Sequence, residues 1–171
     1  MFTKIILSAA VLLGCVNGAC INENDPEGIT LTKGDHLPDF SIILNSGEVV
    51  STASLQGKVS FLVFFNTSCS DCQKELPIIQ QVWEEYQDNP EVMIAAISRE
   101  ENAESIENYW EKNGLTIPWS AQENRDVYSL FAPSVIPRIY IANKKGIITF
   151  TSDDSDMPDL NTLISAIQES F

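Results

Sequence analysis

Apolar runs alternate with segments of helical periodicity through the middle of the chain. GKVSFLVFF, residues 57–65, is apolar almost throughout and predicts a strand that is buried on both faces. LPIIQQVWEEYQ, residues 76–87, spaces its apolar side chains at helical intervals, and EVMIAAIS, residues 91–98, predicts a second buried strand. SIENYWEKNG then predicts a helix that ends near Gly114. This order of elements predicts an α/β fold.

Shorter elements flank this core. LPDFSIILNSGEVVS, residues 37–51, predicts a hairpin, because glycine in the Ser46-Gly47 turn tolerates a positive φ. The remaining predictions are a short helix in RDVYSLFA (125–132), strands in PRIYIAN (137–143) and GIITFTS (146–152), and a closing helix in DLNTLISAIQESF (159–171) capped near Asp159. We therefore expect one α/β domain over residues 34–171, with a central mixed β-sheet flanked by helices and an N-terminal β-hairpin extension.

Composition agrees with a single globular domain and argues against one class of partner. The 171 residues include 44% hydrophobic side chains, enough to form an ordinary core without structural disulfides. The formal net charge of -14 repels phosphate backbones, and no Lys/Arg cluster offsets that repulsion. We expect no nucleic-acid partner.

The N-terminal residues resemble an export signal. Lys4 precedes IILSAAVLLG, an apolar run too short for a stable membrane-spanning helix. The LLGC sequence that ends at Cys15 resembles a bacterial lipoprotein signal, which predicts a signal peptide over residues 1–14 and a lipid anchor on Cys15. An ordinary secretory signal cut near Ala19 is the alternative, and would leave a soluble periplasmic or secreted protein.

An acidic flexible tether is predicted between the signal and the folded part. Residues 15–33 contain the polar stretch CINENDPEGITLTK, which Pro26 and Gly28 interrupt. Cys20 lies in this stretch, and we assign it no function. The expected location is the bacterial cell envelope, as a periplasm-facing lipoprotein that associates with the membrane through its lipid alone.

Two cysteines stand at the start of the first predicted helix, in CSDCQKELP, residues 69–77. A structural zinc site needs four N or S ligands, and beyond Cys69 and Cys72 the predicted domain offers only His36. A c-type haem would need histidine directly after the second cysteine, where Gln73 stands. A disulfide across so short a loop stabilises little, whereas a helix N-terminus favours a reactive thiolate. The spacing indicates thiol–disulfide exchange, without a metal or other cofactor beyond a redox-active Cys69–Cys72 disulfide.

The motif resembles the C-x-x-C-x-x-E-x-P signature of TlpA/ResA-like thiol–disulfide oxidoreductases, a thioredoxin-fold branch related to the AhpC/TSA redoxins. GDHLPDFSI and LQGKVSFLVFF are similar to that family's opening strands, and VIPRIYIANKKGII is similar to its cis-proline strand and hairpin. The resemblance covers residues 34–171. It implies a thioredoxin-like fold and an enzyme that exchanges disulfides with protein substrates.

The resemblance also implies a role for each matching residue. Cys69 would be the nucleophile, and Cys72 the resolving thiol that attacks the mixed disulfide. Glu75, one turn beyond Cys72, would be a buried carboxylate that accepts the Cys72 proton, with an exposed surface glutamate as the alternative. Pro77 would bend the helix. Ile136 and a cis Pro137 would hold an extended substrate.

Departures from the family pattern bear on the direction of exchange. Ser68 replaces the usual tryptophan, and SCSD, residues 68–71, matches a capping box. Asp71 opposes negative charge on the neighbouring sulfurs, while nearby serine hydroxyls favour it. Because these effects oppose each other, we expect no strongly stabilised thiolate, and together with the resemblance this favours a reductase of protein disulfides. Such a reductase needs a membrane thiol donor to restore its dithiol.

Two other functions stay open. A peroxiredoxin would share the fold, but its P-x-x-x-T-x-x-C pattern would need Pro and Thr where Leu62 and Asn66 stand before Cys69. A redox-inert binding module could use the same fold as a scaffold, although the intact C-x-x-C argues against it.

Overall fold

The computed structural model describes residues 28–171, and within them a five-stranded mixed sheet has the strand order β5-β4-β3-β6-β7. The central strand β3 (Val59–Phe65) runs parallel to β4 (Val92–Ser98) and antiparallel to β6 (Arg138–Ala142). Strands β5 (Trp119–Ser120) and β7 (Ile148–Ser152) form the edges. Every residue of β3 is buried, as the apolar run predicts.

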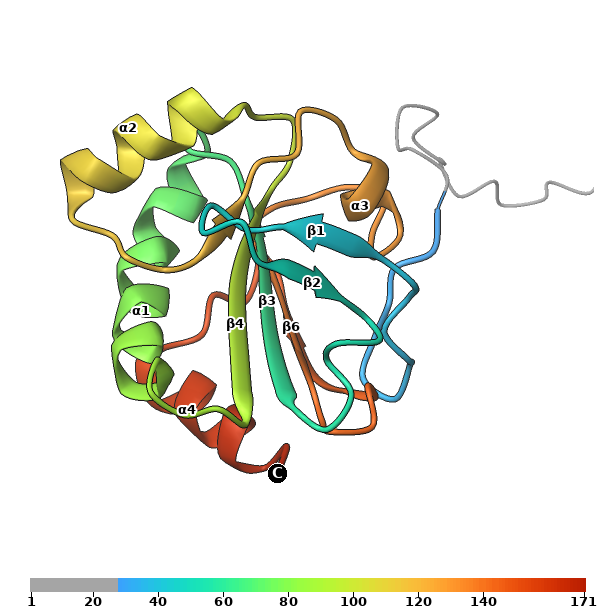
Figure 1. Ribbon diagram of the computed structural model, residues 1–171. Coiled ribbons are helices and arrows are strands. Elements are labelled where there is room, and N and C mark those ends of the chain that lie inside the picture. Colours follow the sequence, from blue (N-terminus) through green and yellow to red (C-terminus); the bar gives the residue numbers. More distant parts are fainter. Residues whose placement is uncertain (1–27) are drawn as a thin grey trace, which may run out of the picture.

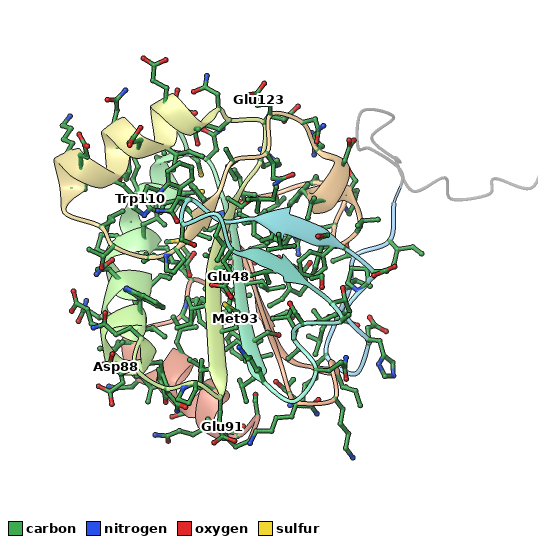
Figure 2. The ribbon with its side chains drawn as sticks, viewed as in Figure 1. Glu48, Asp88, Glu91, Met93, Trp110 and Glu123 are labelled. Atoms are coloured by element: carbon green, nitrogen blue, oxygen red, sulfur yellow. The ribbon has the colours of Figure 1, made fainter. Side chains whose placement is uncertain are left out.

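Helices and a small hairpin cover the two faces of this sheet. The helices are α1 (Ser70–Tyr86), α2 (Ala103–Asn113), α3 (Asp126–Ser129) and α4 (Leu160–Gln168). Figure 1 shows α1, α2 and α4 on one side of the sheet, with the hairpin and α3 on the other. Neighbouring residues of β3 point to opposite faces, so Phe65 contacts Trp110 of α2 while Phe64 contacts Tyr128 of α3. Trp110 lies between α2 and the sheet (Figure 2).

The hairpin is formed by β1 (Ser41–Ile43) and β2 (Val49–Ser51), and Gly47 in its turn has a φ of 86°. Asn45 of the same turn bonds the edge strand β5: its backbone N–H donates to Trp119 O (2.7 Å), and its side-chain Oδ1 accepts from Trp119 N–H (3.1 Å). At the opposite edge, Gly34 N–H donates to Ile148 O (2.8 Å) and Ile148 N–H donates to Asp35 O (2.8 Å). Chain from the N-terminal third therefore bonds one residue of the edge strand on each side of the sheet.

The predicted α/β fold, the N-terminal hairpin and the long helices and strands are confirmed. Asp159 caps α4 by accepting from Thr162 N–H (2.8 Å), and α2 ends at Gly114 with a φ of 65°. The two-residue strand β5 is an addition that the sequence did not predict.

The predicted signal peptide, Cys15, Cys20 and the tether up to residue 27 lie outside the described residues. The last part of the predicted tether is described, and there Leu31 N–H donates to Phe131 O (2.8 Å). Within residues 28–171, no helix has the length and apolar character required to cross a membrane.

Candidate active site

The loops at one end of the sheet bring the two cysteines and the predicted proline together. Strands β3 and β4 are parallel, so their carboxyl ends meet there, and the antiparallel strand β6 begins beside them at Arg138. Cys69 follows β3 and precedes the first residue of α1, while Pro137 immediately precedes β6. Sheet topology thus positions residues that are distant in sequence around a single sulfur.

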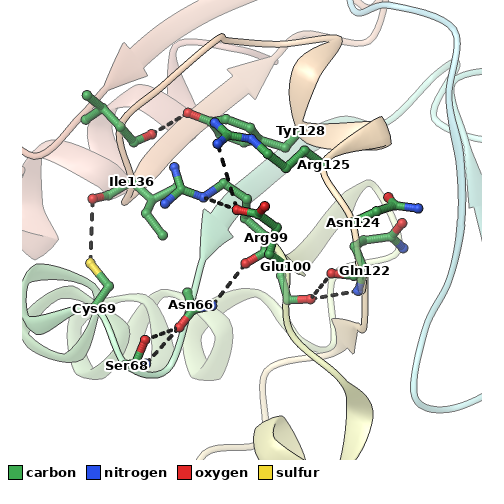
Figure 3. Close-up of polar contacts among 12 residues, drawn as sticks. Asn66, Ser68, Cys69, Arg99, Glu100, Gln122, Asn124, Arg125, Tyr128 and Ile136 are labelled. Atoms are coloured by element: carbon green, nitrogen blue, oxygen red, sulfur yellow. Dashed lines mark hydrogen bonds and ion pairs between the residues drawn. The ribbon is translucent and has the colours of Figure 1, made fainter. Parts of the chain in front are cut away.

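Cys69 is half-buried, and its sulfur lies between two backbone groups. The backbone N–H of Cys72 donates to Cys69 Sγ (3.3 Å), and the Cys69 thiol can donate to Ile136 O (3.6 Å; Figure 3). The first contact is made by one of the unpaired N–H groups at the start of α1. The helix N-terminus therefore supplies a donor to the sulfur that would carry negative charge during exchange.

The predicted capping box is wrong. Cys69, not Ser68, occupies the N-cap of α1, and its own sulfur makes the capping contact. The Ser68 hydroxyl instead donates to Asn66 Oδ1 (2.6 Å), and Asp71 forms an ion pair with Lys74 (2.7 Å). Because Asn66 competes for the serine side chain, the helix begins one residue later than the box requires.

Cys72 is fully buried on the inner face of α1. Burial raises the pKa of its thiol, and the Cys69 side chain and the Glu75 carboxylate act in the same direction, while a hydrogen bond with the Asn66 backbone opposes them. A thiol in these surroundings keeps its proton at neutral pH. It needs a base before it can attack a disulfide.

Glu75 lies one turn further along α1 and is also buried, with 2% of its surface exposed. The alternative of an exposed surface glutamate is therefore wrong, and the exposed Lys74 pairs with Asp71 instead. Burial raises the pKa of Glu75 from 4.5 to about 7. Its Oε1 has no hydrogen-bond partner among the described residues.

A pocket of about 200 Å³ opens beside Glu75, and its walls include Ile78, Met157 and Pro158. Met157 and Pro158 belong to the segment that leads into α4, so the pocket lies between that segment and α1. Glu75 is thus buried within the protein and yet borders a small cavity.

The two predicted prolines occupy the expected backbone positions. The Ile136–Pro137 peptide bond is cis, as predicted, and both residues are buried. Pro77 lies inside α1, where it offers no N–H to the Gln73 carbonyl one turn earlier. The helix nevertheless continues on both sides of Pro77.

The structure adds residues that the sequence did not single out. Glu101, which is nearly buried, accepts hydrogen bonds from the Thr67 backbone N–H (2.8 Å) and from the Thr67 hydroxyl. Asn66 Nδ2 donates to Arg99 O (3.0 Å; Figure 3). Both contacts join the loop before Cys69 to the end of β4. Nothing in the spacing of these residues could have revealed them, because the partners are more than thirty positions apart.

A C-x-x-C at a helix N-terminus, facing a cis-proline at the end of a mixed sheet, defines a thioredoxin-like thiol–disulfide oxidoreductase. Within residues 28–171, no group of three or more His, Cys, Asp or Glu side chains is arranged to hold a metal ion.

Comparisons with known proteins agree with this class. Residues 33–151 match the model of the AhpC/TSA family, and the chain belongs to that family. The thiol–disulfide oxidoreductase ResA of Bacillus subtilis is 25% identical over 139 residues, which cover 79% of this chain and 77% of ResA. The ResA of Oceanobacillus iheyensis is 30% identical over 148 residues, covering 84% of this chain and 74% of the relative.

A solved structure also resembles the whole domain. A protein from Bacteroides thetaiotaomicron assigned as a protein disulfide isomerase superposes with a TM-score of 0.77 and is 28% identical, over 84% of this chain and 92% of that one. The predicted thioredoxin-like fold and the TlpA/ResA-like resemblance are confirmed. This chain is an enzyme of the thiol–disulfide oxidoreductase type.

Proposed function

We propose that this protein reduces disulfides of other proteins in the bacterial cell envelope through a mixed disulfide on Cys69. The observation that carries the proposal is the unequal placement of the two sulfurs. Cys69 is partly exposed and contacts a helix N–H, whereas Cys72 is fully buried behind it. Only the outer sulfur can meet a substrate, and the inner one is close enough to resolve the product.

The reaction consists of two exchanges. The Cys69 thiolate attacks one sulfur of the substrate disulfide, and a mixed disulfide forms as the other substrate sulfur leaves as a thiolate and takes a proton from water. Glu75 then accepts the Cys72 proton, and the Cys72 thiolate attacks Cys69. The second substrate sulfur leaves as a thiolate and takes a proton from water, and Glu75 returns its own proton to water. The substrate disulfide thus becomes two thiols while Cys69 and Cys72 become a disulfide. A thiol donor at the membrane must then reduce that disulfide.

The reductase direction is supported by the modest stabilisation that the site offers the outer sulfur. Strong oxidants are proteins whose reduced thiolate form is heavily stabilised. Among the described residues, Cys69 Sγ accepts a hydrogen bond from one backbone N–H, that of Cys72. The exposed lysine nearby, Lys74, already pairs with Asp71.

Trapping tests the mechanism. A Cys72→Ser variant should accumulate mixed disulfides on Cys69 with a disulfide-bridged peptide, whereas a variant with both cysteines replaced by serine should trap nothing. The wild type should also reduce the peptide in the presence of a small dithiol and leave hydrogen peroxide intact. Rapid peroxide reduction without peptide reduction would favour a peroxiredoxin, and no thiol cycling at all would favour the inert binding module.

The role of Glu75 is tested by the pH dependence of the second exchange. With a pKa of about 7, Glu75 changes from acid to base across neutrality, so the rate of resolution should rise through that pH and then level off. Glu75→Gln should be slower by about tenfold to a hundredfold at neutral pH and should lose this inflection. Glu85→Gln, on the exposed face of α1, is the matched control. Identical single-turnover profiles for wild type and Glu75→Gln would assign the Cys72 proton to another acceptor.

The pocket beside Glu75 supports the same role. A base that accepts a proton in every cycle must release it again, and a buried carboxyl needs water within reach to do so. The pocket bordered by Ile78, Met157 and Pro158 offers such a path from Glu75 to the solvent.

The proposed location in the envelope depends on the N-terminal signal. If Cys15 is lipidated, the wild type should sediment with membranes after expression in a bacterial host, and Cys15→Ala should release it. A wild-type protein that is soluble and begins at or after Cys20 would remove the anchor and leave the secreted alternative.

A further inference from the structure

The loop before β6 has an unusual set of hydrogen bonds. Each of its four consecutive carbonyl oxygens, from residue 133 to residue 136, accepts a hydrogen bond from a side chain. The pairs are Arg125 Nη2 with Pro133 O (2.7 Å), Arg138 Nε with Ser134 O (3.1 Å), Tyr128 Oη with Val135 O (2.5 Å) and Cys69 Sγ with Ile136 O (3.6 Å). Figure 3 shows the Tyr128 and Cys69 contacts on the same short segment. Side chains at the N-cap of α1, at the N-cap and inside α3, and at the start of β6 together set the path of this backbone.

The conformation at the centre of the loop requires such support. Val135 has a φ of 75°, in the left-handed region that β-branched residues rarely adopt. Backbone of this kind persists only where surrounding contacts over-determine it. The hydroxyl of Tyr128 donates to the Val135 carbonyl itself, and Val135 directly precedes Ile136 in the chain.

The Tyr128 side chain is itself rigidly held. Its surface is 1% exposed, and its ring lies edge-on to Phe64 of β3, with 5.4 Å between centroids. The guanidinium groups of Arg99 and Arg125 lie 5.2 Å and 5.5 Å from the ring centroid (Figure 3). A ring fixed by the sheet on one side and by two arginines places its hydroxyl at a defined point.

We propose that Tyr128, supported by Arg125 and Arg138, is a positioning residue that sets the Ile136 backbone for binding an extended peptide beside the reactive sulfur. The inference rests on the proposed function, because it concerns how that site selects its substrates. A peptide that binds as an added strand is held by main-chain hydrogen bonds, so the protein's own backbone groups must be in place beforehand. The network would thereby favour disulfides within polypeptides over small disulfides that lack a peptide backbone.

The contact between Cys69 and Ile136 couples this binding to the chemistry. In the free protein the Ile136 carbonyl can accept a hydrogen bond from the Cys69 thiol. That proton is gone once Cys69 is a thiolate or is bonded to a substrate sulfur, so the carbonyl becomes available to a substrate N–H. The substrate backbone would be held most firmly while the mixed disulfide exists.

Tyr128→Phe tests the proposal, since it deletes the hydroxyl and keeps the ring. For each protein, kcat and KM are measured with a disulfide-bridged extended peptide and with hydroxyethyl disulfide. The ratio of kcat/KM for the peptide to kcat/KM for the small disulfide should fall by about tenfold, mainly through a higher KM for the peptide. Arg125→Met, which deletes the bond to Pro133, should lower the ratio in the same direction and serves if Tyr128→Phe does not fold.

Tyr86→Phe is the control. It deletes a half-buried tyrosine hydroxyl at the last residue of α1, the end of that helix opposite Cys69. Its ratio should equal that of the wild type. Unchanged ratios in both Tyr128→Phe and Arg125→Met, whether or not the two activities fall together, would overturn the positioning role and leave the residues as general supports of the fold. A wild type that reduces neither disulfide would instead refute the proposed function.

Discussion

At the scale of single residues, the two cysteines of one motif have opposite surroundings. Cys69 stands at the helix N-cap, half-buried, where its sulfur accepts a backbone N–H. Cys72 is completely buried, and burial raises the pKa of its thiol. Since the thiolate is the nucleophile, the exposure of Cys69 favours reaction at the first sulfur, and the raised pKa of Cys72 disfavours reaction at the second.

Alkylation of the reduced protein should show this difference. Iodoacetamide should modify Cys69 at least about ten times faster than Cys72 between about pH 6 and pH 9. Peptide mass spectrometry after short exposures gives both rates, and the single variants Cys69→Ser and Cys72→Ser assign them. Faster labelling of Cys72 in the native protein would reverse the proposed roles.

Among the elements, the loop that leads into α1 is tied to the end of the neighbouring strand. The Glu101 carboxylate, just after β4, accepts two hydrogen bonds from Thr67, and Asn66 bonds the backbone of Arg99. Charge-assisted bonds at a nearly buried carboxylate contribute more than ordinary surface contacts. They fix where α1 begins, and hence where the Cys69 sulfur lies.

Glu101→Gln should therefore weaken the domain. The amide keeps the size of the side chain but loses the charged acceptor, so the free energy of unfolding should fall by about 1–3 kcal/mol. Glu107→Gln, an exposed change on α2, should alter it by less than about 0.5 kcal/mol. Urea denaturation of the three proteins compares these values. Equal stability of wild type and Glu101→Gln would mean that the loop is held by other contacts.

The sequence was informative where a pattern is local. The apolar run of β3 predicts a buried strand from seven consecutive residues, and a C-x-x-C before a helix predicts exchange chemistry. It was uninformative where the signal is short or depends on tertiary contacts. Strand β5 has two residues and therefore no period to detect, and the bond from Tyr128 to Val135 exists only because α3 packs beside the loop. The capping-box prediction was wrong for the same reason: the Ser68 hydroxyl donates to Asn66 and does not cap α1.

For the molecule as a whole, the buried acid makes stability depend on pH. The pKa of Glu75 is about 7 in the folded protein and 4.5 in a group free of its surroundings. Below 4.5 both states are protonated, but between 4.5 and 7 the unfolded chain loses this proton first. The free energy of unfolding should fall across that window by up to roughly 3 kcal/mol and stay level above it.

Glu75→Gln should remove this loss. Its free energy of unfolding should match that of the wild type near pH 4.5 and exceed it increasingly up to about pH 7, by up to roughly 3 kcal/mol. Urea titrations at acidic, neutral and mildly alkaline pH give the difference directly. The control Glu85→Gln should follow the wild-type curve at every pH. A difference between Glu75→Gln and wild type that does not vary with pH would show that the carboxyl has the same pKa in the folded and unfolded states.

Asn45 and residues 34–37 bond the two outermost strands of the sheet, β5 and β7. Unpaired strand edges are where folded proteins recruit each other into aggregates, and the danger is greatest near partly unfolded chains. A protein that handles such chains as clients meets that danger in every encounter. Bonds from its own N-terminal third already occupy Trp119 of β5 and Ile148 of β7, which leaves fewer free strand groups for a client to pair with. Under the proposed function, a client would instead meet the loop beside Cys69, where contact leads to exchange and release.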